Sequence, residues 1–446
     1  MKDYRSVADA VAEEIRAGRL RAGDRLPPQR DFAQRHGIAN STATRVYQEL
    51  ARRGLTVGEV GRGTFVRAPS GAAAAPALSE PAERRVDLEL NYPVVPEQAG
   101  LLAAGLGGLL RADVLESALR PVGPAGTPAA RDAAADLLAR GGWRPDPSRI
   151  LFAGSGRQAI SAVVAALARP GARLGVEALT YPVLKAIATR LGVTLVPLAM
   201  DEAGLVPEAV EEAHRSGPLH AVYVQPTLHN PLSLTMPEKR LDHLAEVLLK
   251  LGIHAIEDAV WAFLRDDLPP LASRAPERTV LVDSLSKRLS PGLSLGFAVA
   301  PAAVAGGVVA SLRSGGWAPM RFPLEAMSQW QADGTVRTLV RAKQREAVAR
   351  QELAGRHLGD FVTRGDPGSF YRWWELPRPW RADTFVAAAA RQGIAVTPAA
   401  AFSVGRHRAP NAIRLGLASP GAGTLSWALA TLADLARSTP DDLAND

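Results

Sequence analysis

Short apolar runs alternate with helical stretches over most of this chain. The runs, which read as strands, cover residues 150–152, 173–176, 193–197, 221–224, 254–257, 280–282 and 297–300. Such alternation is typical of a mostly parallel sheet covered by helices on both faces. Because ligands of such sheets bind beyond the C-terminal ends of the strands, we expect the functional residues of this part of the chain to lie there.

The size and composition of the chain exclude several classes of protein. A chain of 446 residues is too long for one compact core, so two or three domains are expected. There is no uncharged apolar run of membrane-spanning length and no signal-peptide pattern, so we expect a cytoplasmic protein. The absence of cysteine excludes disulfides and thiolate chemistry, and the eight histidines lack metal-ligand spacing, so no metal is expected.

Charge is concentrated at the N-terminus. Residues 1–67 contain 13 Lys and Arg against 8 Asp and Glu, a net charge of +5 out of +7 for the whole chain. A small basic domain attached to a nearly neutral one suggests a nucleic-acid-binding module. Residues 68–85 are rich in alanine, proline and serine and are predicted to be a flexible linker. Residues 86–446 would form the large domain, with a smaller subdomain from about residue 313 and a long helix over 324–358.

Three short helices and a glycine-tipped hairpin are predicted before the linker. Gly37 and Gly54 should end the second and third helices, and Asn40 or Ser41 should cap the third. This is the pattern of a winged helix-turn-helix. The predicted helices cover residues 7–17, 29–36 and 41–53, and the predicted wing strands cover 55–58 and 63–66.

The same region resembles the GntR-type DNA-binding domain over residues 4–67. It carries Gly-x-Leu-x-x-Gly-Asp-x-Leu-Pro-x-x-Arg from residue 18, a threonine-containing helix, and Gly-x-Gly-Thr-Phe-Val from residue 61. Arginine suits phosphate or a guanine edge, and hydroxyls at a helix start suit phosphate. Asn40 stands where the family often has arginine, so the operator sequence can differ. A solvated face of a small interaction domain is the alternative. The resemblance implies DNA contacts by Arg30, Ser41, Thr42, Arg45, Arg62 and Gly63.

A single lysine, Lys287, lies between an apolar strand and a Pro-Gly turn. Partial burial beside small, non-acidic residues would favour its neutral, nucleophilic amine. A surface loop lysine is the alternative. The stretch Ser-x-Ser-Lys-x-x-x-Pro-Gly-Leu that begins at Ser284 resembles the cofactor box of the fold-type I pyridoxal 5'-phosphate aminotransferases. That resemblance implies a Schiff base on Lys287 and a contact between the Ser284 hydroxyl and the cofactor phosphate.

Two further segments match that family near the expected phosphate and ring. Ser155, Gly156 and Arg157 follow a predicted strand and open a helix, where exposed amides form an anion site. By resemblance they would hold the cofactor phosphate. Tyr181 follows the next strand and would lie against the pyridine ring, with a core tyrosine as the alternative.

Three polar residues complete the resemblance. Asn230, in an Asn-Pro turn, would donate to the 3'-oxygen of the cofactor. Asp258 ends a buried strand, where a carboxylate needs a cationic partner, and it would keep the pyridine nitrogen protonated so that the ring acts as an electron sink. Arg414, in an Ile-Arg-Leu context, would bind the carboxylate of a substrate or effector. An arginine paired with a structural carboxylate is the alternative.

A GntR-type module, a linker and an aminotransferase-like domain together resemble the MocR/PdxR-like subfamily of GntR regulators over nearly the whole chain. The resemblance implies a winged helix-turn-helix joined to an α/β fold-type I domain with a smaller C-terminal α+β subdomain, and a head-to-tail homodimer that binds double-stranded DNA. It also implies sensing of pyridoxal 5'-phosphate, alone or as an aldimine with an amino compound, with control of vitamin B6 metabolism as the leading hypothesis.

Several positions depart from the aminotransferase pattern. Ser294 replaces a phosphate-binding arginine, Trp261 lies near the position of a missing tyrosine, and the tyrosine expected before Gly126 is absent. Arg120 and Arg157 could replace the lost positive charge. We therefore expect a sensor with at most weak residual aminotransferase activity. The alternatives are an active PLP-dependent aminotransferase with an accessory DNA-binding domain, and a regulator that has lost the cofactor.

Overall fold

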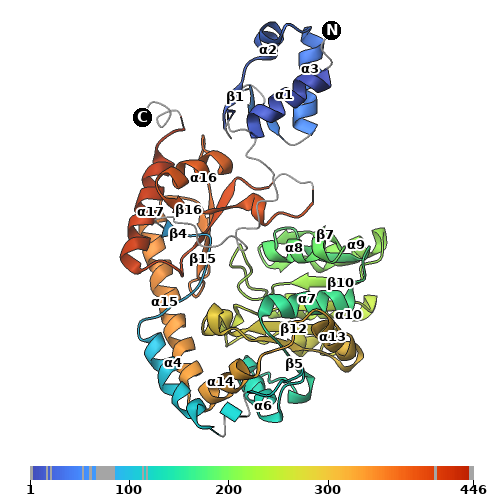
Figure 1. Ribbon diagram of the computed structural model, residues 1–446, viewed down its shortest axis with the longest axis vertical. Coiled ribbons are helices and arrows are strands. Elements are labelled where there is room, and N and C mark those ends of the chain that lie inside the picture. The colour runs from blue at the N-terminus through green and yellow to red at the C-terminus, as the bar shows by residue number, and fades with distance from the viewer. Residues whose placement is uncertain are drawn as a thin grey trace. The chain divides into compact units, whose positions relative to one another are not determined.

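The chain folds into two compact units. One unit consists of residues 1–75 and 383–387, and the other of residues 76–382 and 388–446. The computed structural model describes residues 4–16, 19–20, 23–52, 55–59, 63–66, 86–112, 115–116, 119–405 and 409–440 (Figure 1). The predicted linker, Gly54 and Arg62 lie outside the described residues, so the predicted domain boundaries remain predictions.

The first unit is a winged helix-turn-helix, as predicted. Its elements are α1 (Tyr4–Arg16), β1 (Arg25–Leu26), α2 (Gln29–His36), α3 (Asn40–Arg52), β2 (Thr56–Glu59) and β3 (Gly63–Val66), with antiparallel sheet order β1-β3-β2. Gly37 ends α2 in a left-handed conformation at φ 63°, as expected. The predicted cap of α3 was wrong by one residue, because the helix already begins at Asn40 and the Ala39 carbonyl accepts from the Thr42 and Ala43 amides at 2.9 and 3.0 Å. Strand β1 was not predicted, since two residues carry no periodic signal.

The second unit is built on a seven-stranded sheet, and all seven predicted strands belong to it. The sheet order is β5-β13-β12-β11-β10-β6-β7, and every strand is parallel to its neighbours except β13, which is antiparallel to both of its own. The strands are β5 (Ile150–Ala153), β6 (Arg173–Glu177), β7 (Thr194–Leu198), β10 (Ala221–Val224), β11 (His254–Asp258), β12 (Thr279–Ser284) and β13 (Gly296–Val299).

Helices cover both faces of this sheet, which explains why β5, β10 and β13 are apolar and buried at every position apart from the glycine that begins β13. Alternate residues of β10 enter different cores. Tyr223 packs with α7 (Gly156–Leu167), α8 (Pro182–Arg190) and α13 (Ala302–Ser314), whereas Val222 packs with α9 (Pro207–Ser216), α10 (Glu238–Leu251) and α11 (Leu271–Arg274). This confirms the predicted α/β fold class. The smaller elements are α4 (Gln98–Leu106), η2 (Gly107–Leu110), α6 (Pro128–Leu138), η3 (Pro147–Arg149), β8 (Met200–Asp201), β9 (Gly204–Leu205), η4 (Ala262–Leu264), α12 (Leu285–Arg288) and η5 (Pro291–Leu293).

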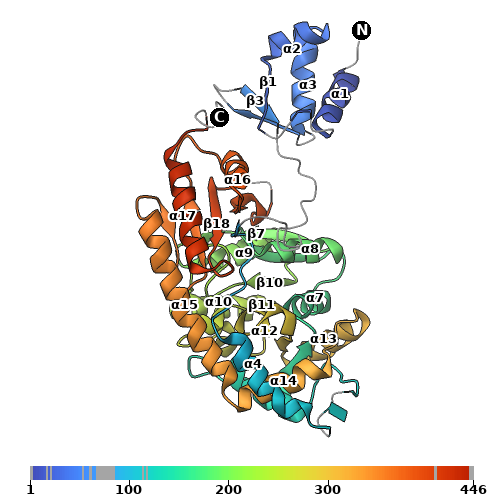
Figure 2. The same cartoon turned by 60° about the vertical axis from the view of Figure 1, so that its left-hand side comes forward.

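The C-terminal subdomain contains an antiparallel sheet of order β14-β15-β18-β17. Helix α17 runs beside α15 in both views (Figures 1 and 2). The N-terminal strand β4 (Val86–Asp87) pairs in parallel with β16 of this subdomain. Its elements are β14 (Thr363–Arg364), β15 (Tyr371–Glu375), α16 (Ala382–Arg391), β16 (Ile394–Ala395), β17 (Thr397–Pro398), η6 (Ala399–Ala401), β18 (Ala412–Gly416) and α17 (Ala422–Arg437).

The single long helix predicted over 324–358 was wrong. The structure has two helices, α14 (Arg321–Ala332) and α15 (Thr335–Leu358). The break falls at Gly334, whose φ of 81° is left-handed and therefore incompatible with a continuous helix. In the part of the chain that the structure describes, no helix has both the length and the apolar character needed to cross a membrane.

Candidate functional site

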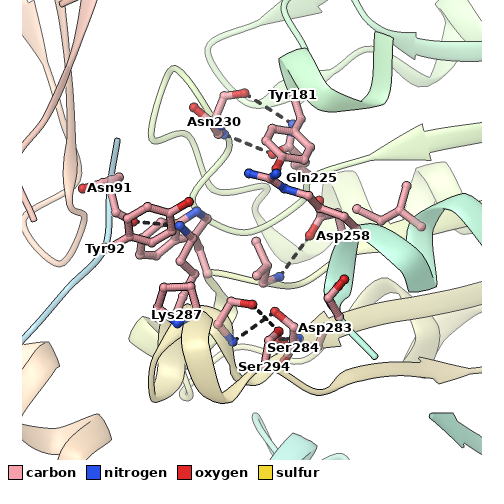
Figure 3. A pocket seen from close by; sticks show the side chains of 18 of the residues that line it. Asn91, Tyr92, Tyr181, Gln225, Asn230, Asp258, Asp283, Ser284, Lys287 and Ser294 are labelled. Carbon is pink, nitrogen blue, oxygen red and sulfur yellow. Dashed lines mark hydrogen bonds between the residues drawn. The ribbon is translucent and has the colours of Figure 1, made fainter. Parts of the chain in front are cut away.

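A cavity of about 330 Å³ lies at the C-terminal ends of the strands, where the sequence predicted ligand binding. Residues from the C-terminal subdomain and from the segment after β4 complete its wall (Figure 3). All eight predicted cofactor residues and the predicted effector arginine line this one cavity: Ser155, Gly156, Arg157, Tyr181, Asn230, Asp258, Ser284, Lys287 and Arg414.

One end of the cavity is a cradle of hydroxyls and a helix N-terminus. Ser155 caps α7 by accepting a hydrogen bond from the Gln158 amide at 3.3 Å. A Cβ added to Gly156 would lie 2.9 Å from the Ser284 Cβ, so only glycine fits between the two loops. The N-terminus of a twelve-residue helix with neighbouring hydroxyls suits an anion such as phosphate.

Two more hydroxyls and one arginine extend this cradle. The Ser286 and Ser294 hydroxyls lie 2.6 Å apart, and both residues line the cavity, so Ser294 contributes a neutral hydroxyl to the cavity wall. The guanidinium of Arg157 donates hydrogen bonds to the hydroxyls of Tyr181 and Tyr92. Arg157 therefore contributes a guanidinium to the cavity wall.

Lys287 lies on the short helix α12, directly after β12. Its Nζ donates to the Asn91 carbonyl at 2.8 Å and lies 4.0 Å from the centre of the Tyr92 ring. Burial, and then the positive charges of Arg157 and Arg414, lower the pKa of Lys287 well below its ordinary value. A neutral amine is the form that attacks a carbonyl carbon.

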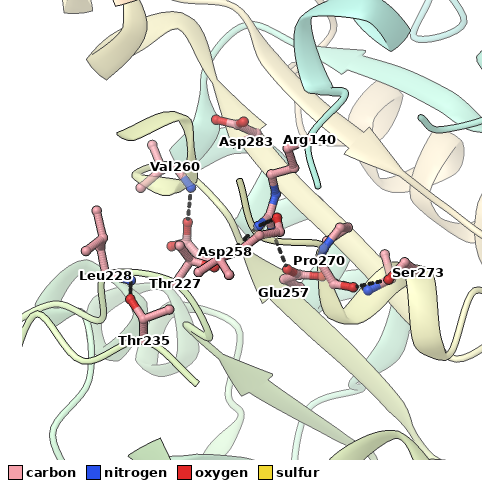
Figure 4. Close-up of polar contacts among 12 residues, drawn as sticks. Arg140, Thr227, Leu228, Thr235, Glu257, Asp258, Val260, Pro270, Ser273 and Asp283 are labelled. Atoms are coloured by element: carbon pink, nitrogen blue, oxygen red, sulfur yellow. Dashed lines mark hydrogen bonds and ion pairs between the residues drawn. The ribbon is translucent and has the colours of Figure 1, made fainter. Parts of the chain in front are cut away.

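Asp258 presents a buried carboxylate to the other side of the cavity. Its side chain accepts a hydrogen bond from the Tyr223 hydroxyl. It also accepts one from the Val260 amide at 3.1 Å (Figure 4). Burial raises the pKa of Asp258 from 3.8 to about 6. Since no cationic side chain of the described residues lies within ion-pair distance, the carboxylate is suited to a cationic ligand atom.

Behind Asp258, two buried ion pairs fix the ends of β11 and β12. Arg140 donates to Glu257 at 2.9 Å, and both side chains are nearly inaccessible to solvent (Figure 4). Arg288 donates to Asp283 at 2.6 Å. Removing one partner of such a pair leaves an uncompensated buried charge, so these pairs hold the strand ends rigidly.

Arg414 is buried and lies beside Asn230. Its Nη1 donates to the Asn230 Oδ1 at 3.4 Å, and its Nη2 donates to the Glu89 carbonyl and to the Thr397 hydroxyl. Its Nε has no hydrogen-bond partner among the described residues. Burial lowers the pKa of Arg414, while Tyr371 and then the carboxylates of Glu89 and Asp87 oppose this shift, so a structural carboxylate partner stays the alternative to a ligand.

Comparison with known proteins places these observations in a family. A model of the aminotransferase class I and II family matches residues 116–432, and a model of the bacterial regulatory proteins of the gntR family matches residues 3–66. The HTH-type transcriptional regulator YdeF of Bacillus subtilis is 30% identical over 421 residues, which cover 94% of this chain and 90% of the relative. Both domains are thus shared along nearly the full length.

The chain belongs to the MocR/PdxR-like subfamily of GntR regulators.

Two further relatives carry the names of this subfamily. PdxR of Corynebacterium glutamicum, an HTH-type pyridoxine biosynthesis transcriptional regulator, is 28% identical over 450 residues, 96% of each chain. MocR of Rhizobium meliloti, a probable rhizopine catabolism regulatory protein, is 25% identical over 391 residues, 81% of this chain and 78% of the relative. The protein is therefore a transcriptional regulator with an aminotransferase-like domain, as the sequence predicted.

Solved structures agree with the fold of the large domain of this MocR/PdxR-like regulator. An archaeal alanine:glyoxylate aminotransferase matches with a TM-score of 0.73 and 20% identity over 80% of this chain and 91% of that one. LysN of Thermus thermophilus, an α-aminoadipate aminotransferase complexed with N-(5'-phosphopyridoxyl)-L-leucine, matches with a TM-score of 0.69 and 22% identity over 79% and 92%. At this identity the similarity shows the fold alone.

The predicted DNA-contacting residues of the regulator lie on the winged helix-turn-helix. Arg30 is on α2, and Ser41 and Arg45 are on α3, all three exposed, whereas Thr42 is half-buried. Gly63 begins β3, and Arg62 lies outside the described residues. Their contact with DNA remains a prediction.

Several residues that line or support the cavity of the regulator were not singled out from the sequence. Asn91 and Tyr92, from the segment after β4, and Tyr371, from β15, line it. Tyr223 does not line the cavity but reaches Asp258 from the neighbouring strand. The Tyr371 hydroxyl is buried and has no hydrogen-bond partner in the part of the chain that the structure describes. Alternation along β10 could have placed Tyr223, but the contacts of the other three join distant parts of the chain. Arg120 is exposed beside Glu116 and does not line this cavity.

Proposed function

We propose that this regulator binds DNA through its winged helix-turn-helix and senses pyridoxal 5'-phosphate, alone or with an amino compound, through the cavity of its aminotransferase-like domain. One observation carries the proposal: Lys287, Asp258, Asn230 and a hydroxyl cradle at the start of α7 converge on a single cavity. These groups match, in type and place, the amine, carboxylate, amide and phosphate donors that such a cofactor needs.

The chain's own groups fit the cofactor chemically. Arg157, the Gly156 amide and the Ser155 and Ser284 hydroxyls suit a phosphate. Asp258 suits a protonated ring nitrogen, and Tyr181 suits the flat ring face. The bound cofactor would supply an aldehyde able to form a Schiff base with an amine, and a ring that stabilises negative charge. The neutral Lys287 amine would be the nucleophile.

Sensing is favoured over turnover by the residues that are missing. Ser294 provides a neutral hydroxyl where aminotransferases carry arginine, and Trp261 occupies the region of an expected tyrosine. A relative named as a regulator of pyridoxine biosynthesis supports a role in vitamin B6 metabolism. The second candidate is an active PLP-dependent aminotransferase with an accessory DNA-binding domain, favoured by the retention of Lys287, Asp258 and Arg414.

The proposed partners follow from the two domains. Arg30 and Arg45 would contact DNA phosphates or base edges, with Ser41, Thr42 and Gly63 near the backbone. Arg414 would take the carboxylate of an amino effector. DNA binding implies a cytoplasmic location, and we propose a head-to-tail homodimer on the family resemblance.

The proposal is tested by titrating the full-length protein with pyridoxal 5'-phosphate, reducing with borohydride and locating the adduct by mass spectrometry. We expect visible absorbance and an adduct on Lys287, both lost in Lys287→Ala. Lys185→Ala is the matched control, because Lys185 is also partly buried with a lowered pKa but donates to the Ala401 and Ser403 carbonyls outside the cavity. No adduct at saturating cofactor would refute the proposal.

Turnover is measured separately by following loss of the absorbance band when single amino acids are added in excess. A sensor should form a persistent species and release no keto acid. Multiple turnovers with an amino donor and a keto acid acceptor would instead establish the aminotransferase alternative.

A further inference from the structure

Residues Glu89–Tyr92, here called the clasp, line the cavity and are docked on the C-terminal subdomain (Figure 3). The side-chain amide of Asn91 forms two hydrogen bonds with that subdomain. Its Nδ2 donates to the Phe370 carbonyl at 3.0 Å, and its Oδ1 accepts from the Ala418 amide at 2.9 Å. Asn91 is itself buried. The clasp is thus hydrogen-bonded to the residue before β15 and to the segment after β18.

Further contacts fasten the clasp at both ends. The Tyr92 amide donates to the Ser419 hydroxyl at 3.0 Å, and that hydroxyl donates to the Leu90 carbonyl at 2.9 Å. A Cβ on Gly416 would lie 2.9 Å from both the Leu88 and the Leu90 carbonyl oxygens, so the backbone lies directly against β18. The clasp is therefore held in a defined conformation against the C-terminal subdomain.

Two backbone carbonyls of the clasp accept hydrogen bonds from the two side chains to which the proposed function assigns the ligand, the Lys287 amine and the Arg414 guanidinium. The Asn91 carbonyl accepts from the Lys287 Nζ at 2.8 Å. The Glu89 carbonyl accepts from the Arg414 Nη2. One four-residue segment therefore occupies the hydrogen-bonding positions of both side chains.

A ligand would compete for both positions. Condensation of the Lys287 amine with an aldehyde forms a C=N bond, breaks the C=O bond and releases one water, so the nitrogen loses the N–H groups that now face the Asn91 carbonyl. A carboxylate bound bidentately by Arg414 would need two N–H groups on one edge of the guanidinium, and Nη2 now donates to the Glu89 carbonyl and to the Thr397 hydroxyl. Schiff-base formation therefore removes one contact of the clasp, and a carboxylate competes with the other.

We propose that ligand binding releases the clasp from Lys287 and Arg414. This release couples ligand binding in the cavity to the DNA affinity of the winged helix-turn-helix. This rests on the proposed function. Along the chain, the clasp follows β4 and the predicted linker, so it is the part of the cavity wall nearest in sequence to the DNA-binding domain. A ligand shifts an equilibrium only through contacts that differ between two states, and these two carbonyls supply such contacts.

Hydrogen–deuterium exchange of the full-length protein with and without pyridoxal 5'-phosphate tests this inference. The amides of Glu89 and Leu90 donate to the Asp87 carboxylate at 2.7 and 2.9 Å, and that of Tyr92 donates to Ser419, so all three report on the clasp. We expect exchange in a peptide covering 86–95 to become at least about fivefold faster with cofactor, the low end of usual coupling energies. Unchanged or slower exchange would overturn the inference.

A substitution outside the cavity separates release from ligand binding. Ser419→Ala removes two clasp contacts without touching Lys287 or Arg414, and Ser426→Ala on α17, whose hydroxyl contacts His357, is the matched control. A DNA duplex that the wild-type protein binds is first selected from a pool of random sequences. The DNA affinity of each variant is then measured on this duplex. If cofactor changes wild-type affinity by roughly 5- to 150-fold, Ser419→Ala without cofactor should shift in the same direction and respond to cofactor by less than about twofold.

The outcomes distinguish this inference from the proposed function. No borohydride-trapped adduct on Lys287 would refute the cofactor proposal itself. An adduct together with an unchanged clasp, or a Ser419→Ala response equal to that of wild type, would leave the cofactor proposal standing and overturn the clasp. Far-ultraviolet circular dichroism of each variant confirms that it is folded.

Discussion

Asp258 is a buried carboxylate for which the described residues supply hydrogen bonds but no cation. Burying an ionised group without a charged partner costs free energy, and here burial raises the pKa of Asp258 to about 6. Such a group is retained where a bound ligand supplies the missing positive charge. In the proposed function the cofactor's protonated ring nitrogen does so, and the Tyr223 hydroxyl holds the carboxylate in place.

Asp258→Asn should make the cofactor-free protein more stable near neutral pH while weakening cofactor binding. Between pH 3.8 and about 6 the folded wild type keeps a proton that the unfolded chain has released, so its stability falls as pH rises through this window. Above this pH window, the free energy of unfolding of Asp258→Asn should exceed that of wild type by up to about 3 kcal/mol, which corresponds to the rise in the pKa of Asp258 from 3.8 to about 6. Urea unfolding at pH 4 and pH 8 measures this difference.

The binding half of that prediction is independent. Because the variant loses a charge-assisted contact with the cofactor, its affinity for pyridoxal 5'-phosphate should fall by roughly tenfold or more. A variant that is no more stable at pH 8, or that binds cofactor as tightly as wild type, would contradict the role assigned to Asp258.

Gly296 shows how one element positions the phosphate side of the cavity. A Cβ at this position, the start of β13, would lie 2.2 Å from the Ser155 carbonyl oxygen, so the strand and the loop before α7 touch through backbone. Gly296→Ala should cost about 1–3 kcal/mol in unfolding free energy and weaken cofactor binding, because the Ser155 loop must move. Gly292→Ala, with no atom within 4 Å of its Cβ, is the control. Equal behaviour of the two variants in urea unfolding would contradict this account.

Helix α15 is tied to the turn that carries Lys287. The fully buried Lys343 of this helix donates to the carbonyls of Lys287 and Leu289 at 3.0 and 2.6 Å. Burial lowers the pKa of Lys343 from 10.5 to about 7. A neutral amine still has two N–H groups, which is enough for both carbonyls.

Lys343 should make stability rise with pH. Between about pH 7 and 10.5 the unfolded chain binds a proton that the folded protein has released. Over this range, the free energy of unfolding of wild type relative to Lys343→Met should therefore increase by up to about 5 kcal/mol. Arg350→Met, which removes another buried basic side chain of the same helix, is the control. Chemical denaturation at pH 7 and pH 10 measures the difference, and a pH-independent gap would show that Lys343 is charged in both states.

At the scale of elements, the sequence predicted what depends on local pattern. The seven strands of the main sheet are apolar runs with clear ends, and Gly37 marks the end of α2 through its own conformation. The break between α14 and α15 was missed because Gly334 lies within a region read as one helix. The two-residue strand β1 is too short to leave a pattern.

The candidate site was predictable where a family motif covers it and not where distant segments meet. Lys287, Asp258 and Asn230 were all placed on one cavity by motif and strand order. The clasp was not, because its contacts join residues 89–92 to residues 370–419, and no local pattern encodes such pairs. The same holds for Tyr371, whose buried hydroxyl, without a hydrogen-bond partner among the described residues, is visible only in the fold.

At the scale of the whole molecule, the two domains make separable predictions. If Arg30 and Arg45 contact phosphates, Arg30→Ala and Arg45→Ala should each weaken DNA binding across sequences and reduce the slope of log affinity against log salt by about one. Arg169→Ala, an exposed arginine of the aminotransferase-like domain, should leave the slope unchanged. Fluorescence anisotropy at several salt concentrations measures it, and wild-type slopes in both variants would contradict the assigned DNA surface.

The most direct test of the account is the DNA affinity of the full-length protein with and without saturating pyridoxal 5'-phosphate, measured in parallel on wild type, Lys287→Ala and Lys185→Ala. We expect cofactor to change the affinity of wild type and Lys185→Ala alike, by roughly 5- to 150-fold, and to leave that of Lys287→Ala unchanged. Identical DNA affinity with and without cofactor in wild type that carries the Lys287 adduct would contradict a cofactor-sensing regulator.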